Sequence, residues 1–269
     1  MSIGRVRRLA HAARSRTGTL ALSRTELGWL AAGCVIVAAA VVGFLGVSED
    51  VVRHNGLSSS DPQRLQFFVD HRTAWLDRLS ETASKLGSAP FLALVAVIAA
   101  VVLYRTGKPV LVAVLPGLAL GFAAGVAEVL KVTVGRARPD AAFRLVNETA
   151  PSFPSGHSTD SAALYLALGL VVAVFVAKRP WVRAIGVIAA AAAAGLIGAS
   201  RLVLGVHWPS DVIAGLLLGT AITTTAITAS YVAAKMTPGT SAALPTRVLV
   251  VLLRTRAPAE PERPSLAVA

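Results

Sequence analysis

Residues 181–211 read WVRAIGVIAAAAAAGLIGASRLVLGVHWPSD, and this stretch decides the fold. Its first part, 181–204, is dominated by Ala, Val, Leu, Ile and Gly and is long enough to cross a bilayer, which takes about 20 apolar residues. The run ends beside Arg201, and His207 and Asp211 follow before the next apolar run. The stretch therefore predicts two membrane-spanning helices joined by a short polar connection.

The apolar character of this stretch extends over the whole chain. Hydrophobic residues make up 55% of the 269 residues, charged residues only 15%, and the mean hydropathy is +0.67. A soluble domain of this size carries more charge. Apolar runs lie at about 27–47, 89–104, 110–131, 159–178, 181–204 and 211–235. We therefore predict an all-α fold, a polytopic membrane helical bundle of about six transmembrane helices.

The longest polar connection, 48–88, carries a different pattern. Asp61-Pro62 is a typical helix start, and apolar residues recur from there to Leu79 at helical spacing between charged residues. This pattern predicts an interfacial amphipathic helix lying on the membrane surface. A helix that packs on the membrane domain without touching lipid fits the pattern equally well.

The charge of the chain is strongly positive and unevenly placed. The net charge is +12, and the basic residues concentrate in the two tails and in short loops. The positive-inside rule explains this bias, and attraction to anionic lipid headgroups is a compatible second cause. We expect a multi-pass protein of the cell membrane with both termini cytoplasmic and no nucleic-acid partner. Cys34 is the single cysteine, so an intrachain disulfide is excluded.

Three polar clusters interrupt the apolar sequence: KVTVGRARP at 131–139, PSGH at 154–157 and SRLVLGVHWPSD at 200–211. Each lies beside a long apolar run, where the desolvation of cations and histidines is expensive and indicates a function. In the first cluster, the Lys131 ammonium and the forked Arg138 guanidinium are a suitable pair for phosphate oxygens. Arg136 is expected to extend toward lipid headgroups.

The second cluster precedes an apolar helix, whose free N–H groups attract an anion. Gly156 allows close approach of a ligand, and Ser155 adds a hydroxyl donor. The competing interpretation is a simple helix cap formed by Ser155 and the residues after Gly156.

In the third cluster, Pro209 suits the first turn of the last helix. Asp211 follows His207 by four residues, so its carboxylate is within reach of one imidazole nitrogen and leaves the other as a nucleophile. Packing of His207 beside Trp208 at the membrane edge is the competing interpretation.

All three clusters, in their order and spacing, resemble the three signature motifs of the type 2 phosphatidic acid phosphatase superfamily, a likeness that covers 131–211. The resemblance implies a membrane-embedded phosphatase domain, with its active site at the extracytoplasmic surface. It implies that His207 forms a phosphohistidine, that Asp211 orients it and that His157 is the general acid. The residues that hold the phosphoryl oxygens would be Lys131, Arg138, Ser155, Gly156 and Arg201.

The domain boundaries expected from these observations are a basic cytoplasmic tail at 1–26, the phosphatase domain at 27–235 and a disordered cytoplasmic tail at 236–269. The expected activity is metal-independent hydrolysis of a lipid phosphate in the bilayer: polyprenyl diphosphate, phosphatidylglycerol phosphate or phosphatidic acid. No cofactor is expected, and the oligomeric state is left open. The alternatives are a phosphotransferase with the same site and a non-catalytic transporter or scaffold, against which His157, His207 and Asp211 argue. Vanadium haloperoxidases share the anion-site pattern but are soluble.

Overall fold

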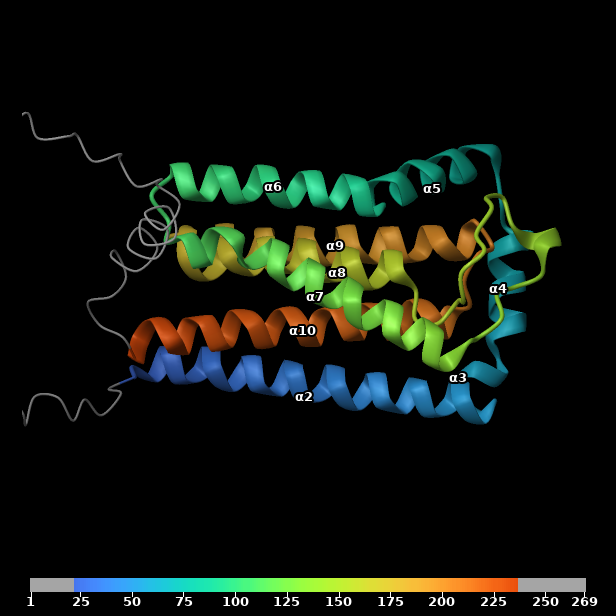
Figure 1. The fold of residues 1–269 in the computed structure, drawn as a ribbon, viewed down its shortest axis with the longest axis horizontal. Helices are drawn as coiled ribbons and strands as arrows, with labels where there is room; N and C mark the ends of the chain where they lie inside the picture. The colour runs from blue at the N-terminus through green and yellow to red at the C-terminus, as the bar shows by residue number, and fades with distance from the viewer. Residues whose placement is uncertain (1–21, 237–269) are drawn as a thin grey trace, which may run out of the picture.

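The computed structural model describes residues 22–236, and in this part of the chain long helices lie side by side (Figure 1). Five are long and apolar enough to cross a membrane, and the pair α5 and α6 forms a sixth candidate span, bent by 53°. The prediction of a helical membrane bundle with about six spans is confirmed. The long helices are α2 (Arg24–Arg53), α6 (Ala89–Arg105), α7 (Val110–Val134), α8 (Gly156–Val171), α9 (Pro180–Val203) and α10 (Pro209–Met236), and α8 continues into a π-helical turn, η2 (Val172–Val176).

Local sequence signals explain where several helices begin and end. Ser23 and Glu26 form a reciprocal capping box at the start of α2. Pro209 is the first residue of α10, as predicted, because a helix start needs no N–H from that residue. Gly135 ends α7 with a φ of 62°, a left-handed conformation that favours glycine. The chain after Gly135 leaves the bundle as a loop and returns at α8.

Helix α8 lies at the centre of the bundle and packs against α7, α9 and α10, while α10 also packs against α2. Small residues allow this close approach. A Cβ atom added at Gly219 of α10 would lie 2.5 Å from the Thr159 carbonyl oxygen of α8. By contrast, a Cβ atom added at Gly121 of α7 would meet nothing within 4 Å. The α8–α10 contact is thus the one that demands glycine.

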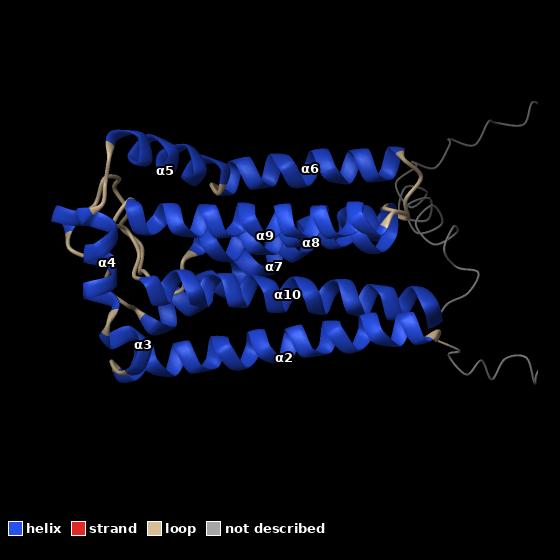
Figure 2. Cartoon of the chain, turned by 180° about the vertical axis from the view of Figure 1, so that it is seen from behind, coloured by secondary structure: helices blue, strands red, loops and turns tan. Residues whose placement is uncertain are grey.

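The polar connection 48–88 folds into three helices, α3 (Gly56–Ser59), α4 (Asp61–Asp70) and α5 (Ala74–Leu86). The predicted start at Asp61-Pro62 is confirmed, but the helix ends at Asp70, and Leu79 belongs to α5. Helix α4 lies across one end of the bundle, and α5 leads into α6 along its edge (Figure 2). The break is held by Arg72, which donates hydrogen bonds to the carbonyl oxygens of Val203 and Phe143, each at 2.7 Å.

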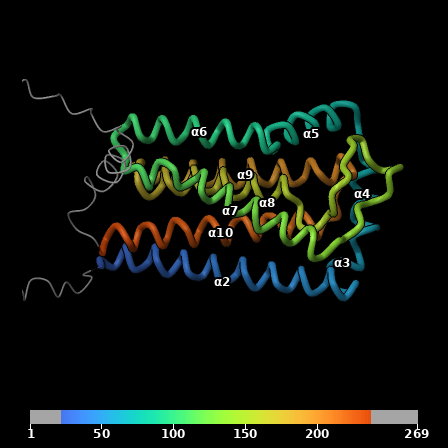
Figure 3. Tube along the Cα trace, viewed as in Figure 1, coloured from blue at the N-terminus to red at the C-terminus, as the bar shows by residue number. Residues whose placement is uncertain are grey.

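The two ends of the bundle differ in character. At one end, Lys235 of α10 pairs with Glu26 of α2, and Lys108 donates to the Phe175 carbonyl oxygen at 2.7 Å. The opposite end carries α3, α4 and the connections that contain the three polar clusters (Figure 3). The predicted separation of the basic loops from the clusters is therefore present. Most of both predicted tails lies outside the described residues, and the domain boundaries stay a prediction.

The α8–α10 contact yields a stability prediction. Gly219→Ala should destabilise the protein by about 1–3 kcal/mol, because the added methyl group forces the two helices apart. Gly121→Ala is the matched control, because its methyl group enters open space, and it should be neutral or stabilising. Thermal unfolding of both variants in detergent micelles measures the difference. Equal midpoints for the two variants would contradict the packing argument.

Candidate active site

The three clusters meet at the end of the bundle that carries α4. Arg138 of the first cluster lies against the third, with its Nη1 at 3.1 Å from His207 Nε2 and donating to the Val206 carbonyl oxygen at 2.8 Å. The second cluster touches the third where the Ser155 N–H donates to the Asp211 carbonyl oxygen at 3.1 Å. A Cβ atom on Gly156 would lie 3.1 Å from Lys131 Nζ, so the first and second clusters are also adjacent.

Ser155 is the N-cap residue of α8. Its hydroxyl oxygen accepts a hydrogen bond from the Ser158 hydroxyl at 3.0 Å and caps the Ser158 N–H at 3.5 Å. The capping interpretation of the second cluster is therefore correct as far as structure goes. His157 follows in the first turn of α8, where it interacts with the charges of Arg201, Glu148 and Lys131. A role for Ser155 in phosphate binding stays a prediction.

The spacing of His207 and Asp211 has a local cause. Trp208 precedes the first residue of α10, and its N–H donates to Asp211 Oδ2 at 2.9 Å. A carboxylate three residues after the N-cap commonly reaches back to that N–H. Asp211 therefore caps its own helix, and the same oxygen lies 3.4 Å from His207 Nδ1.

The contacts of His207 determine which ring nitrogen carries the proton. An arginine donates and never accepts, so the Arg138 contact requires a lone pair on His207 Nε2. The proton is then on Nδ1, facing Asp211 at 3.4 Å. This separation is an ion-pair distance but too long for a hydrogen bond, and Nδ1 has no hydrogen-bond partner among residues 22–236. In empty sites such contacts are often long and shorten when substrate binds.

His207 is almost completely buried. Burial, with smaller contributions from Arg138 and Arg201, lowers the pKa of its imidazole to about 4, although the Asp211 carboxylate acts in the opposite direction. The ring is therefore neutral at neutral pH, with Nε2 available as a nucleophile.

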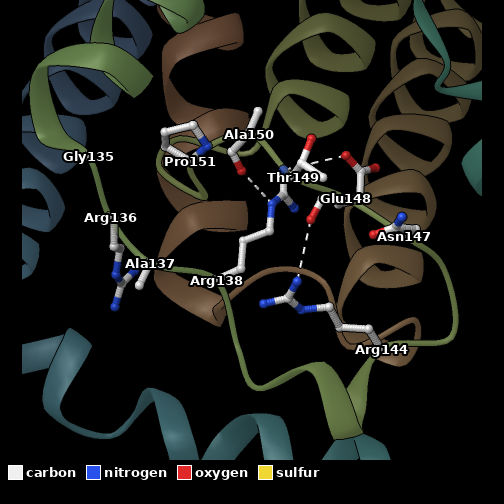
Figure 4. Close-up of a pocket in the computed structure, with 10 residues that line it drawn as sticks. All are labelled: Gly135, Arg136, Ala137, Arg138, Arg144, Asn147, Glu148, Thr149, Ala150 and Pro151. Atoms are coloured by element: carbon white, nitrogen blue, oxygen red, sulfur yellow. Dashed lines mark hydrogen bonds and ion pairs between the residues drawn. The ribbon is translucent and has the colours of Figure 1, made fainter.

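Glu148 is a site residue that the sequence analysis did not identify. Its Oε1 forms an ion pair with Arg201, which is only 1% exposed, and its Oε2 lies 3.5 Å from Arg138 Nη2. Burial opposes ionisation of Glu148, but the charges of Arg201 and Arg138 outweigh it and hold the pKa of that carboxyl below its usual range. Figure 4 shows Arg138 and Glu148 pointing toward one another across the loop. The carboxylate bridges two cations that were predicted to hold phosphate.

Helix α5 also contributes to the site. Arg201 Nη1 donates to the Ser84 hydroxyl, while the buried Arg201 Nε has no partner within the described chain. Gly87, at the bend between α5 and α6, lies against His157 and Ile197, and an added Cβ atom would be 3.3 Å from His157 Cδ2. The bent pair therefore covers the site from the side, a long-range contact that the sequence does not signal.

Arg136 does not behave as predicted. Its side chain is only 16% exposed, and instead of extending to headgroups it pairs with Asp211 at 2.6 Å and with Asp61 at 2.7 Å. Two buried carboxylates attract the guanidinium more strongly than the membrane surface does. Lys131 pairs with Glu128 at 2.6 Å. Between residues 22 and 236, no group of three or more His, Cys, Asp or Glu side chains is placed to hold a metal ion.

Comparison with known proteins gives concordant results. The model of the PAP2 superfamily matches residues 111–235, which contain all three clusters. Phosphatidylglycerophosphatase B of Bacillus subtilis (strain 168) is 34% identical over 174 residues, covering 62% of this chain and 82% of the relative. Undecaprenyl-diphosphatase of Sulfolobus acidocaldarius is 39% identical over 100 residues, covering 34% of this chain and 42% of the relative. The crystal structure of a transmembrane PAP2 type phosphatidylglycerolphosphate phosphatase from Bacillus subtilis has a TM-score of 0.63 at 29% identity, covering 71% of this chain and 93% of that one.

The Glu148 bridge generates a binding prediction. Glu148→Gln removes an anion that competes for Arg138 and Arg201, so vanadate should bind about 10-fold more tightly, equivalent to ~1.4 kcal/mol. Glu81→Gln, which removes an exposed carboxylate from α5, is the charge-matched control and should leave the affinity unchanged. Titration calorimetry on the purified proteins measures both. Weaker vanadate binding by Glu148→Gln would show that the carboxylate supports the anion instead of competing with it.

Proposed function

The chain belongs to the PAP2 superfamily, and on that premise we propose that it hydrolyses phosphate-bearing membrane lipids through a phosphohistidine on His207. Its relatives are lipid and polyprenyl phosphatases, and the apolar helices make it a multi-pass membrane protein. The observation that carries the proposal is the 3.1 Å contact between Arg138 Nη1 and His207 Nε2. It supports a neutral imidazole whose lone pair faces a cationic pocket, which is the arrangement that attack on phosphorus requires.

In the first step, His207 Nε2 attacks the phosphorus atom, and the bond from phosphorus to the lipid oxygen breaks. The leaving oxygen takes a proton from His157, which lies at the start of α8 beside Arg201. The negative charge of an arriving phosphate favours protonation of His157. The phosphorylated imidazole is cationic, and the neighbouring Asp211 carboxylate compensates that charge.

In the second step, water attacks the phosphohistidine and breaks the phosphorus–nitrogen bond. His157 accepts the water proton, the reverse of its role in the first step. Free phosphate leaves, and His207 regains its lone pair on Nε2. Throughout, Arg138, Arg201 and Lys131 compensate the charge on the equatorial oxygens.

Three cations in one pocket support metal independence. Arg138 and Arg201 are buried, and the Lys131 side chain is only 11% exposed, so their charges act with little screening by water. They supply the charge compensation that Mg²⁺ provides in many phosphoryl-transfer enzymes. Ser155 and Gly156 contribute the backbone N–H groups of the α8 start.

The proposed substrates are lipids with a terminal phosphate: polyprenyl diphosphate, phosphatidylglycerol phosphate or phosphatidic acid. Two relatives support the first two, because they are a phosphatidylglycerophosphatase and an undecaprenyl-diphosphatase by name. Which of these lipids is preferred is decided by a panel of purified lipid phosphates, compared by kcat/KM.

The mechanism is tested by phosphate release in detergent micelles with EDTA present. The wild-type protein should remain active in EDTA, and His207→Ala should lose about 10⁴-fold or more, because the nucleophile is gone. Alkaline quenching with radiolabelled substrate should trap phosphohistidine in the wild type alone. Loss of activity in EDTA with recovery in Mg²⁺ would overturn metal independence. A phosphorylated acceptor in place of free phosphate would identify a phosphotransferase.

We further propose that both termini are cytoplasmic and that the site is extracytoplasmic. The support is the basic end of the bundle opposite the clusters, which carries Arg105, Lys108, Lys178, Arg179 and Lys235. In a Cys34→Ala background, an impermeant thiol reagent should label Asn147→Cys but not Thr106→Cys in intact cells. Both positions are exposed and lie on connections at opposite ends. Labelling of Thr106→Cys alone would reverse the proposed orientation.

A further inference from the structure

Arg136 joins two buried carboxylates that come from distant parts of the chain. Its Nη1 lies 2.6 Å from Asp211 Oδ1, and its Nη2 lies 2.7 Å from Asp61 Oδ2. The side chains of Asp211 and Asp61 are 0% and 1% exposed. Desolvation of two carboxylates is tolerable only if a cation compensates both, and the forked guanidinium does so with one nitrogen for each.

Ser210 closes this network. Its N–H donates to Asp61 Oδ1 at 3.0 Å, its hydroxyl is hydrogen-bonded to Asp61 Oδ2, and Arg136 Nη1 donates to its Oγ at 2.7 Å. The Trp208 ring lies 5.7 Å from the Arg136 guanidinium carbon, a cation–π contact. Asp61 is the first residue of α4, and Ser210 is in the first turn of α10. The network therefore ties the helix across the end of the bundle to the helix that carries the catalytic carboxylate.

The orientation of Asp211 follows from this network. Arg136 engages Oδ1, while Oδ2 accepts from the Trp208 N–H at 2.9 Å and faces His207 Nδ1 at 3.4 Å. The positive charge of Arg136 alone would weaken the attraction between Asp211 and a cationic imidazole. Asp61 offsets that charge, so the sequence of charges from Asp61 through Arg136 to Asp211 alternates.

We propose that Asp61 and Arg136 are positioning residues for the nucleophile: Arg136 fixes the Asp211 carboxylate, and Asp61 balances Arg136 so that Asp211 keeps its effect on His207. Neither residue touches the reacting atoms. The predicted effect on turnover rests on the proposed function. The predicted effect on the ionisation of the His207 ring does not.

The two residues should act on His207 in opposite directions. Asp61→Asn leaves the charge of Arg136 unbalanced, which disfavours a protonated His207. Arg136→Gln removes a cation and favours it. The double variant removes both charges, so its effects should largely cancel. The other charged or titratable groups that face the ring, Asp211 on α10, Arg138 in the loop, Arg201 on α9 and His157 on α8, are unchanged in all three variants.

The test is NMR titration of the full chain in detergent micelles with ¹⁵N-labelled histidine. The chain has only five histidines, and the His207→Ala variant assigns the resonance. Relative to wild type, the midpoint of the His207 titration should fall in Asp61→Asn and rise in Arg136→Gln, each by about one unit, a tenfold change in protonation constant. The double variant should titrate like wild type. Shifts in the same direction, or no shift in either single variant, would overturn the proposal.

Two controls separate positioning from general damage. Glu49→Gln removes a carboxylate from an exposed pair with Arg53 on α2 and should leave the titration unchanged. If either single variant fails to fold, the double variant decides, because it removes the charges as a neutral pair. Its kcat should fall by about 10-fold, with KM within about twofold of wild type, because Asp211 is no longer held. Wild-type kcat in the folded double variant would refute positioning. Opposite titration shifts without any phosphohistidine in the wild type would leave the positioning intact and refute the proposed chemistry.

Discussion

The rest of the structure depends on the burial of charged groups at one end of a membrane bundle. Arg201 is 1% exposed and Asp211 0%, and neither is tolerable there without a partner of opposite charge. Glu148 from the loop before α8 supplies one partner, and Arg136 from the loop after α7 supplies the other. Because each pair joins separate elements, correct packing of the helices and pairing of the charges are the same condition.

The helices supply rigid positions for these charges. Helix α8 approaches α10 so closely at Gly219 that no larger residue fits without movement, and this contact aligns the starts of both helices. His157 is then one residue inside α8, and Asp211 is two residues inside α10. Side chains in a first helical turn have less freedom than side chains in a loop, so the catalytic groups are held by the most constrained parts of the bundle.

Much of the fold could be predicted because hydropathy and motif spacing are local properties of the sequence. The six candidate spans and the start of α4 follow from such patterns. Glu148 and Asp61 were missed because their partners lie 53 and 75 residues away, and no local pattern records such a pairing. Arg136 was misassigned for the same reason, since an arginine at a helix end extends to headgroups unless a buried acid is near. A lone glutamate between two basic motifs was the available signal for Glu148.

The Glu148 bridge bears on how such a site selects its ligand in a membrane. The pocket is already occupied by a carboxylate of this chain, so anion binding is an exchange and its free energy is a difference. A singly charged phosphodiester lipid replaces one negative charge with another and gains little. A terminal phosphate carries up to two charges and offers three oxygens to Arg138, Arg201 and Lys131, so it gains charge-assisted contacts that the carboxylate does not make. In a bilayer composed mainly of phosphodiester lipids, this exchange favours the lipids whose phosphate is terminal.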